Sequence, residues 1–168
     1  MSYQKQVKNK FINIFKSNYF DCSLYDFALV LSQLIIIILH FIKISIFNFY
    51  YLGEIPVTFQ NLGKLLIIFG IIFLIFSIKE LGNNLSPFPR PKKDGKFISK
   101  GIYKIFKHPM YYSLMIFSLG LFLINLSIYN LILSIALSII LFLKIKQEEK
   151  YLKNKFPDYL KYKNRLNL

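Results

Sequence analysis

The sequence has few of the residues that build disulfides, metal sites or acidic surfaces. It contains one cysteine, Cys22, and two histidines among 168 residues. A lone cysteine cannot form an intramolecular disulfide, and no Cys/His spacing of the zinc-site type is present. Aspartate and glutamate together number 8 against 22 lysines and arginines, which gives a formal net charge of +14. We therefore set aside an intramolecular disulfide and expect no metal.

Apolar residues are abundant instead. They make up 55% of the chain, and the mean hydropathy is +0.45. A water-soluble domain of this length would not carry nearly continuous apolar runs, so the composition indicates a membrane protein. The basic residues fall between the apolar runs rather than on one face, which argues against nucleic acid as a partner.

Four apolar segments account for most of the hydrophobic residues, at 27–47, 62–78, 111–128 and 130–143. The first is long enough to cross a hydrocarbon core of about 30 Å as a helix. In lipid each segment has to satisfy its own backbone hydrogen bonds, which makes helix the expected structure. The sequence therefore predicts an all-α fold with four transmembrane helices, the last two forming a tight hairpin that turns near residues 125–130.

Lysine and arginine are concentrated in alternate connections between these segments. They number four in residues 1–26, none in 47–61, eight in 79–107, none in 125–130 and eight in 144–168. By the positive-inside rule this pattern places both termini in the cytoplasm. The first apolar run is too long for a signal-peptide core, so we expect a retained anchor.

The chain is expected to form a single membrane domain over 1–168, with the tail and first two spans in 1–80 and a core in 81–168. Gln33, His40 and Lys43 are the polar exceptions in the first two spans. We interpret His40 and Lys43, near the outer end of the first span, as structural residues that lie far from any site.

Three features are expected at the membrane surface around the last two spans. Residues 86–91 are too rich in proline for helix and predict an extended loop. Apolar residues at helical spacing predict a short interfacial helix over 98–106. The fourth helix is expected to continue beyond Leu143 to a break at Phe156. Pro157 then suits the first turn of a final short helix.

Two polar motifs flank the last two apolar segments. Residues 101–113 read GIYKIFKHPMYYS, and residues 148–162 read EEKYLKNKFPDYLKY. The pair resembles the integral-membrane methyltransferases of the isoprenylcysteine carboxyl methyltransferase and phospholipid methyltransferase group. Their pattern reads G-x-Y-x-x-x-R-H-P-x-Y-x-G, a helical hairpin, then E-E-x-x-L-x-x-x-F-x-x-Y-x-x-Y. The stretch LGNNLSPFPRPKKD at 81–94 is similar to the loop that precedes this core in bacterial members.

The resemblance covers about residues 81–166 and has two departures. Lys107 stands where the family has arginine before His-Pro, which keeps the charge but loses a bidentate fork. Ser113 stands where glycine is common. Neither change removes a reacting group.

The resemblance implies an enzyme that transfers a methyl group from S-adenosylmethionine to a lipophilic acceptor at the cytoplasmic membrane face. The acceptor would be an isoprenylcysteine-like carboxylate, an isoprenoid or a lipid. A site for this methyl donor needs a cationic or donor group, a carboxylate and aromatic walls. The residues expected to hold the cofactor are Tyr103, His108, Pro109, Tyr111, Glu148, Glu149, Tyr159 and Tyr162, and those expected to be catalytic are His108 and Arg165.

Each of these residues also has a purely structural interpretation. His108 can satisfy a helix end, Glu148 and Glu149 can pair with neighbouring lysines, and interfacial tyrosines commonly anchor spans. Adjacent helical residues point about 100° apart, so one glutamate is expected to face the cofactor and the other a structural cation.

Two other function classes remain open from the sequence. A membrane reductase of the sterol-reductase type would bind a nicotinamide cofactor, with Arg90, Lys92, Lys93 and Lys96 near its extra phosphate. A non-enzymatic small membrane protein, such as a transporter, would carry ionisable residues inside its spans, and the last two spans carry none. The sequence does not predict the oligomeric state.

Overall fold

The computed structural model describes residues 22–42 and 55–166. Its helices are α2 (Leu24–Phe41), α3 (Val57–Leu81), α4 (Pro109–Asn125), α5 (Ile128–Lys155) and α6 (Tyr159–Arg165), with two short 3-10 helices, η2 (Gly82–Asn84) and η3 (Gly101–Lys104). The described residues contain no strand, which confirms the predicted all-α fold. Residues 1–21 and Lys43 lie outside the described residues.

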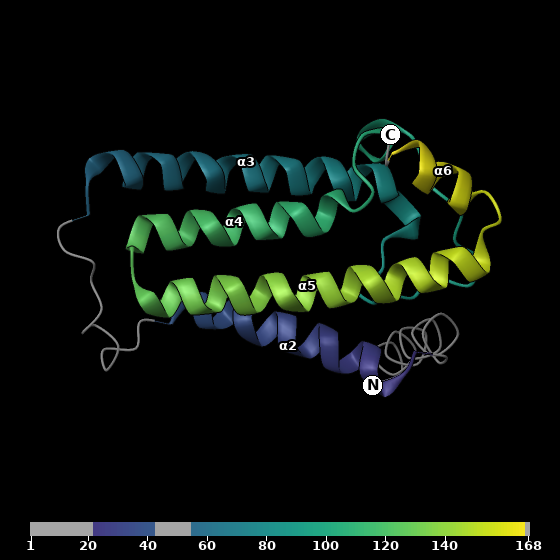
Figure 1. Ribbon diagram of the computed structural model, residues 1–168, viewed down its shortest axis with the longest axis horizontal. Coiled ribbons are helices and arrows are strands. Elements are labelled where there is room, and N and C mark those ends of the chain that lie inside the picture. The colour runs from purple at the N-terminus through teal and green to yellow at the C-terminus, as the bar shows by residue number, and fades with distance from the viewer. Residues whose placement is uncertain (1–21, 43–54, 167–168) are drawn as a thin grey trace, which may run out of the picture.

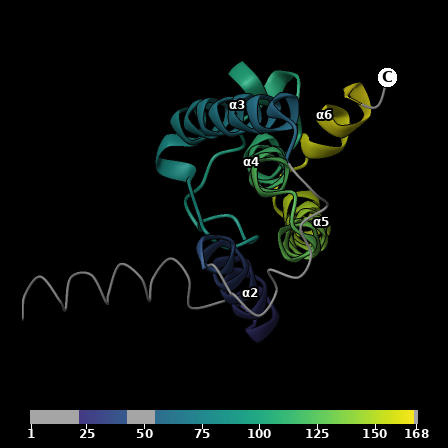
Figure 2. The same ribbon diagram turned by 90° about the vertical axis from the view of Figure 1, so that its left-hand side faces the viewer.

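The four long helices run along one another (Figure 1). Viewed end-on they follow the order α3, α4, α5, α2 (Figure 2). The connection between α3 and α4 runs from the end of α3 to the side of α2 and then back to the start of α4 (Figure 2). On that side Phe88 packs against Phe27 of α2, with ring centroids 4.7 Å apart. The end of α5, α6 and this connection therefore all lie at one end of the bundle.

Local sequence signals fix where the helices begin. Ser23 and Asp26 form a reciprocal capping box at the start of α2, with backbone-to-side-chain distances of 3.1 and 3.2 Å. Pro109 occupies the first turn of α4, where its missing N–H costs nothing. Ser127 accepts a hydrogen bond from the Asn130 backbone at 3.1 Å and starts α5. The predicted hairpin turn is thus confirmed, and it consists of little more than Leu126 and Ser127.

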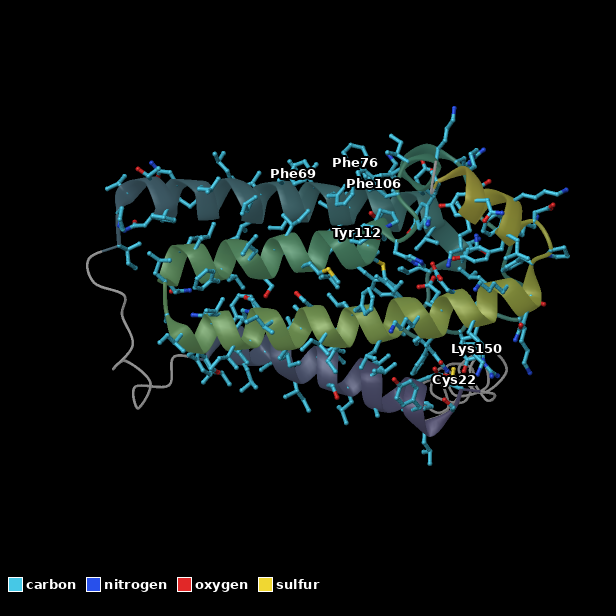
Figure 3. All side chains as sticks on the ribbon, viewed as in Figure 1. Cys22, Phe69, Phe76, Phe106, Tyr112 and Lys150 are labelled. Carbon is cyan, nitrogen blue, oxygen red and sulfur yellow. The ribbon has the colours of Figure 1, made fainter. Side chains whose placement is uncertain are left out.

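Three of the described helices, α2, α3 and α5, are long and apolar enough to cross a membrane. Helix α4 has 17 residues, at the lower end of the roughly 17–25 needed to span. Large apolar side chains point away from the bundle, as Phe69 and Phe76 of α3 do in Figure 3. Both are more than half exposed, at 54% and 56%. Apolar side chains that would be costly in water face lipid instead, as expected for a membrane protein.

Helices α3 and α4 approach closely because glycine lies at the contact. A Cβ atom built on Gly63 would lie 2.8 Å from the Gly120 carbonyl oxygen, and one on Gly120 would lie 2.8 Å from the Gly63 carbonyl oxygen. Small residues at helix contacts let backbones pack together where no hydrophobic effect operates between helices. This packing carries the start of α4 alongside the end of α3.

The predicted interfacial helix over 98–106 is wrong, because only the 3-10 turn η3 forms there. Gly101 has φ of 55° and lies against the side chain of Glu80, so the chain turns sharply at this point. Phe106 packs on Phe73 of α3, with ring centroids 5.3 Å apart.

The elements on either side of η3 follow the predictions more closely. The segment at 86–91 is non-helical as predicted, and α5 does continue beyond Leu143, ending before Phe156. Pro157 precedes α6 by two residues instead of lying in its first turn.

Candidate active site

His108 lies at the point where the two sequence motifs meet. It is the residue before α4, and its side chain is buried, with 4% of the residue exposed. Its Nδ1 atom lies 3.6 Å from Oε2 of Glu148, and its Nε2 atom lies 3.6 Å from Oε1 of Glu149. The imidazole therefore stands between two carboxylates from the late turns of α5.

The surroundings of His108 favour its charged form. Burial by itself lowers the pKa of an imidazole, but the interactions with Glu148 and Glu149 outweigh burial and raise the pKa of His108 to about 9. At neutral pH the ring is an imidazolium whose two nitrogens both donate. Nε2 has no hydrogen-bond partner among the described residues. His108 is thus suited to donate a hydrogen bond, and not to accept a proton.

The two glutamates differ in their surroundings. Glu148 lines a pocket, whereas Glu149 does not. Glu149 instead forms an ion pair with Lys163 of α6, with Nζ and Oε2 at 2.5 Å. Glu149 therefore faces a structural cation, as expected of one of the two glutamates, and Glu148 faces the pocket. The cation, however, comes from α6 and not from the neighbouring lysines of α5.

The pocket lies between the connection that follows α3, the start of α4, the end of α5 and α6. Among the residues predicted from sequence, those that line it are Tyr103, His108, Tyr111, Glu148, Tyr159 and Tyr162. Pro109, Glu149 and Arg165 are not among the lining residues. Most of the predicted set is therefore brought to one cavity, from three separate segments of the chain.

Aromatic rings form much of the pocket wall. Phe97 makes edge-to-face contacts with Tyr159 and Tyr162, with ring centroids 5.9 and 5.1 Å apart. The Tyr162 hydroxyl donates to the Tyr103 carbonyl at 2.6 Å, which ties α6 to η3. The Tyr111 ring stacks near the His108 ring, at 5.9 Å and 28°.

The phenols of this wall stay protonated. Burial, followed by the charge of nearby Glu148, raises the pKa of Tyr103, and burial followed by the charge of Glu149 raises that of Tyr159. Burial also raises the pKa of Tyr162, to about 12. Like His108 Nε2, the Tyr159 hydroxyl is a buried polar atom of the pocket residues that makes no hydrogen bond among the described residues.

Arg165 lies apart from this cavity. It is exposed on α6, with its guanidinium carbon 5.7 Å from the centroid of the Tyr162 ring. Its catalytic role stays a prediction.

Two residues of the pocket were not assigned to the methyl-donor site from the sequence. Arg90, named only for the nicotinamide alternative, lines the pocket and places its guanidinium carbon 4.6 Å from the centroid of the Tyr151 ring, with a buried Nε that has no hydrogen-bond partner among the described residues. Phe97 was not named at all. Both lie in the loop that the sequence comparison picked out at 81–94 or directly after it. Their closeness in sequence to that loop is the signal that could have assigned them to the site.

A bundle of apolar helices with a charged and aromatic pocket at one end indicates a membrane protein with a candidate site in that pocket. The model of the phospholipid methyltransferase family matches residues 59–159, more than half of the chain. The protein belongs to this family, which confirms the resemblance seen in the sequence and gives the protein its class, that of a membrane methyltransferase. No curated protein matches the chain. The matched residues include nearly all of α3, the whole of α4 and α5, and every residue lining the pocket except Tyr162, but not α2.

Proposed function

We propose that the protein transfers a methyl group from S-adenosylmethionine to a lipophilic acceptor. The observation that carries this proposal is the position of His108 between Glu148 and Glu149, at an aromatic pocket in a chain of the phospholipid methyltransferase family. The pocket would hold the methyl donor, and the acceptor would reach it from the membrane.

The chemistry of the pocket residues fits this donor. Its ammonium and ribose hydroxyls require an acceptor such as the Glu148 carboxylate, which lines the pocket. Its carboxylate requires a donor, and His108 Nε2 and the Tyr159 hydroxyl are both buried without a partner among the described residues. Aromatic rings such as that of Phe97 in the pocket wall suit a sulfonium cation. When bound, S-adenosylmethionine supplies an electrophilic methyl group.

The residues of the chain contribute positioning and exclusion of water. His108, held as an imidazolium, offers a fixed hydrogen-bond donor at the base of the pocket. The rings of α6 and η3 close over the polar groups, which strengthens each electrostatic contact. These are the effects that a displacement at carbon needs most, because it depends on alignment of the reacting atoms.

An apolar groove between α4 and α5 supports a lipophilic acceptor. It is lined on α4 by Met115 and Leu119 and on α5 by Ile135, Ile139 and Phe142, among others. Along the bundle the groove ends near the site, since Met115 lies only about 7.5 Å further along α4 than Met110, which lines the pocket. A hydrocarbon chain in this groove would direct a polar head toward His108.

The distribution of lysine and arginine supports a cytoplasmic site. The connection at 79–107 and the segment at 144–168 each carry eight basic residues, and both border the pocket. A cytoplasmic pocket would face the compartment that holds the water-soluble methyl donor, with both chain termini on that side.

Calorimetry on detergent-purified protein tests the proposal. Wild-type protein should bind S-adenosylmethionine, and the variants Glu148→Gln and His108→Ala should bind it at least about tenfold more weakly, since each loses a charge-assisted contact. Lys150→Gln is the matched control, because Lys150 is an exposed neighbour of Glu149 that does not line the pocket. Absence of binding by folded wild type would overturn the proposal. Binding of a reduced nicotinamide cofactor instead would favour the reductase class.

A further inference from the structure

Helix α2 lies outside the residues that match the family, yet it carries a regular series of polar residues. Asp26, Gln33 and His40 are spaced seven apart, which places them on one face of the helix. Asp26 is fully buried and His40 is 8% exposed. Polar groups inside a membrane protein are costly unless they have partners. The partners of these three residues show what α2 does.

Gln33 binds a buried lysine of α5. Its Oε1 atom accepts from Lys144 Nζ at 2.5 Å, and Lys144 is only 2% exposed. The same ammonium donates to the Pro87 carbonyl at 3.1 Å and lies 5.4 Å from the centroid of the Tyr111 ring. Pro87 lies between the pocket residues Ser86 and Phe88, and Tyr111 itself lines the pocket. Lys144 therefore joins α2 to two parts of the pocket wall.

The two hydrogen-bond acceptors of Lys144 are neutral, and Glu148, one turn further along α5, acts on it only through its charge. Within the part of the chain that the structure describes, no carboxylate forms an ion pair with it. A buried ammonium without an ion pair depends on its remaining hydrogen bonds, because leaving them unmade costs the full desolvation of the charge. The Gln33 amide oxygen makes the shorter of its two hydrogen bonds.

Asp26 makes a second connection of the same kind. Its Oδ2 atom accepts from the Tyr151 hydroxyl at 2.9 Å. The Tyr151 ring lies beneath the guanidinium group of Arg90, which lines the pocket. Moving seven residues forward on α2, from Asp26 to Gln33, moves seven residues back on α5, from Tyr151 to Lys144. The two helices thus pair antiparallel in one register.

His40, the third member of the series, makes no connection to the pocket. Its Nε2 atom lies 2.8 Å from the Ser118 hydroxyl and 3.4 Å from the Ser134 hydroxyl, and neither serine lines the pocket. It therefore fastens α2 to α4 and α5 at the far end. This makes His40 a natural control, since it holds the same helix to the same partners without contacting the site.

We propose that α2 supports the wall of the methyl-donor pocket from behind, and that Gln33 and Asp26 act as positioning residues through Lys144 and Tyr151. Gln33 with Lys144 fixes Tyr111 and the segment around Pro87, and Asp26 with Tyr151 fixes Arg90. The identity of the ligand rests on the function proposed above, but the positioning of the pocket wall does not.

The test compares Gln33→Met and Lys144→Met with the control His40→Leu. Both methionine variants should weaken S-adenosylmethionine binding about tenfold, the effect of losing one hydrogen bond to a charged group. His40→Leu should lower the melting temperature but change the dissociation constant by less than about twofold, because distant sites act independently. The double variant Gln33→Met/Lys144→Met should bind no more weakly than Lys144→Met, and Gln33→Glu, which keeps the acceptor, should retain wild-type affinity.

Hydrogen exchange of residues 85–98 gives a measurement that needs no cofactor. Exchange should be faster in Gln33→Met and Lys144→Met than in wild type, and unchanged in His40→Leu. If Lys144→Met does not fold, Gln33→Met and Tyr151→Phe carry the same comparison, since Tyr151→Phe removes the hydroxyl that donates to Asp26. Unchanged exchange in the α2 variants, or an equal effect of His40→Leu, would overturn the proposal. Failure of wild type to bind S-adenosylmethionine would overturn only the proposed function. The hydrogen-exchange comparison would still test whether α2 positions the pocket wall.

Discussion

His108 Nδ1 lies 3.6 Å from Glu148 Oε2, although 39 residues of apolar hairpin separate them in the chain. His108 precedes the first helix of the hairpin, and Glu148 lies near the end of the second. Because the hairpin turns back on itself, its open end brings the two motifs together. The contact therefore forms only when α4 and α5 are paired. Assembly of the site thus depends on folding of the hairpin.

This contact predicts a pH-dependent stability. The pKa of His108 is raised from 6.5 to about 9 by Glu148 and Glu149 against the effect of burial, so the charged ring stabilises the fold. For a raised pKa the stabilisation is complete below the unfolded value and is lost as the pH rises through the folded one. The melting temperature of wild type in detergent should therefore fall as the pH rises from about 6.5 to about 9. The loss should be at most roughly 3 kcal/mol.

The control for this prediction is His108→Gln, which keeps a polar side chain that does not titrate. Its melting temperature should be lower near neutral pH and should change much less over the same interval. An equal slope in wild type and variant would show that another group is responsible.

A second prediction concerns the ion pair between Glu149 and Lys163 of α6. Lys163→Met removes the cation that holds Glu149, with Nζ and Oε2 at 2.5 Å, and should loosen α6 over the pocket. We expect S-adenosylmethionine binding to weaken by roughly fivefold, in keeping with the loss of a charge-assisted contact. Lys161→Met, an exposed lysine on the same short helix, should leave binding unchanged. Equal behaviour of the two variants would contradict the prediction.

Most of the fold could be predicted from the sequence because lipid leaves the backbone little choice. The apolar runs indicated the helices, and Asn125 and Ser127 fell in the expected turn. The prediction failed where the chain leaves the membrane. The apolar residues at 98–106 have helical spacing, but Gly101 turns the chain beside Glu80, and Phe106 packs on α3 instead. Such a turn depends on a tertiary neighbour, which no local pattern contains.

The residues of the candidate site likewise fall into those that could be predicted from the sequence and those that could not. His108, Glu148 and the pocket tyrosines could be found because they belong to two compact motifs. Lys163 and Lys144 could not, because their partners lie on other helices and depend on the register of packing. One signal was present, however. Polar residues every seven positions along an otherwise apolar helix indicate a face that packs on a polar partner.

A third prediction concerns the close contact between α3 and α4. Gly120→Ala would place a Cβ atom 2.8 Å from the Gly63 carbonyl oxygen, where neither backbone can yield without moving a helix. We expect a loss of about 1–3 kcal/mol in the free energy of unfolding, the usual cost of overpacking. Leu119→Ala is the control, since Leu119 is 44% exposed toward lipid and should change stability less. Thermal unfolding in detergent measures both, and an equal loss in Leu119→Ala would argue against a specific contact.

The last prediction separates Tyr162 from Arg165, two residues of α6 expected at the site. The buried Tyr162 hydroxyl donates to the Tyr103 carbonyl at 2.6 Å, so Tyr162→Phe leaves that carbonyl unpaired. The expected cost is about 1–3 kcal/mol of stability, with weaker binding of S-adenosylmethionine as α6 and η3 separate. Arg165→Ala should leave donor binding within about twofold of wild type, because the side chain is exposed and does not line the pocket. Methyl transfer measured against acceptor concentration then decides the role of Arg165. A raised KM for the acceptor with unchanged donor affinity would place it at the acceptor head, whereas weakened donor binding would show that α6 moves to bring it into the pocket.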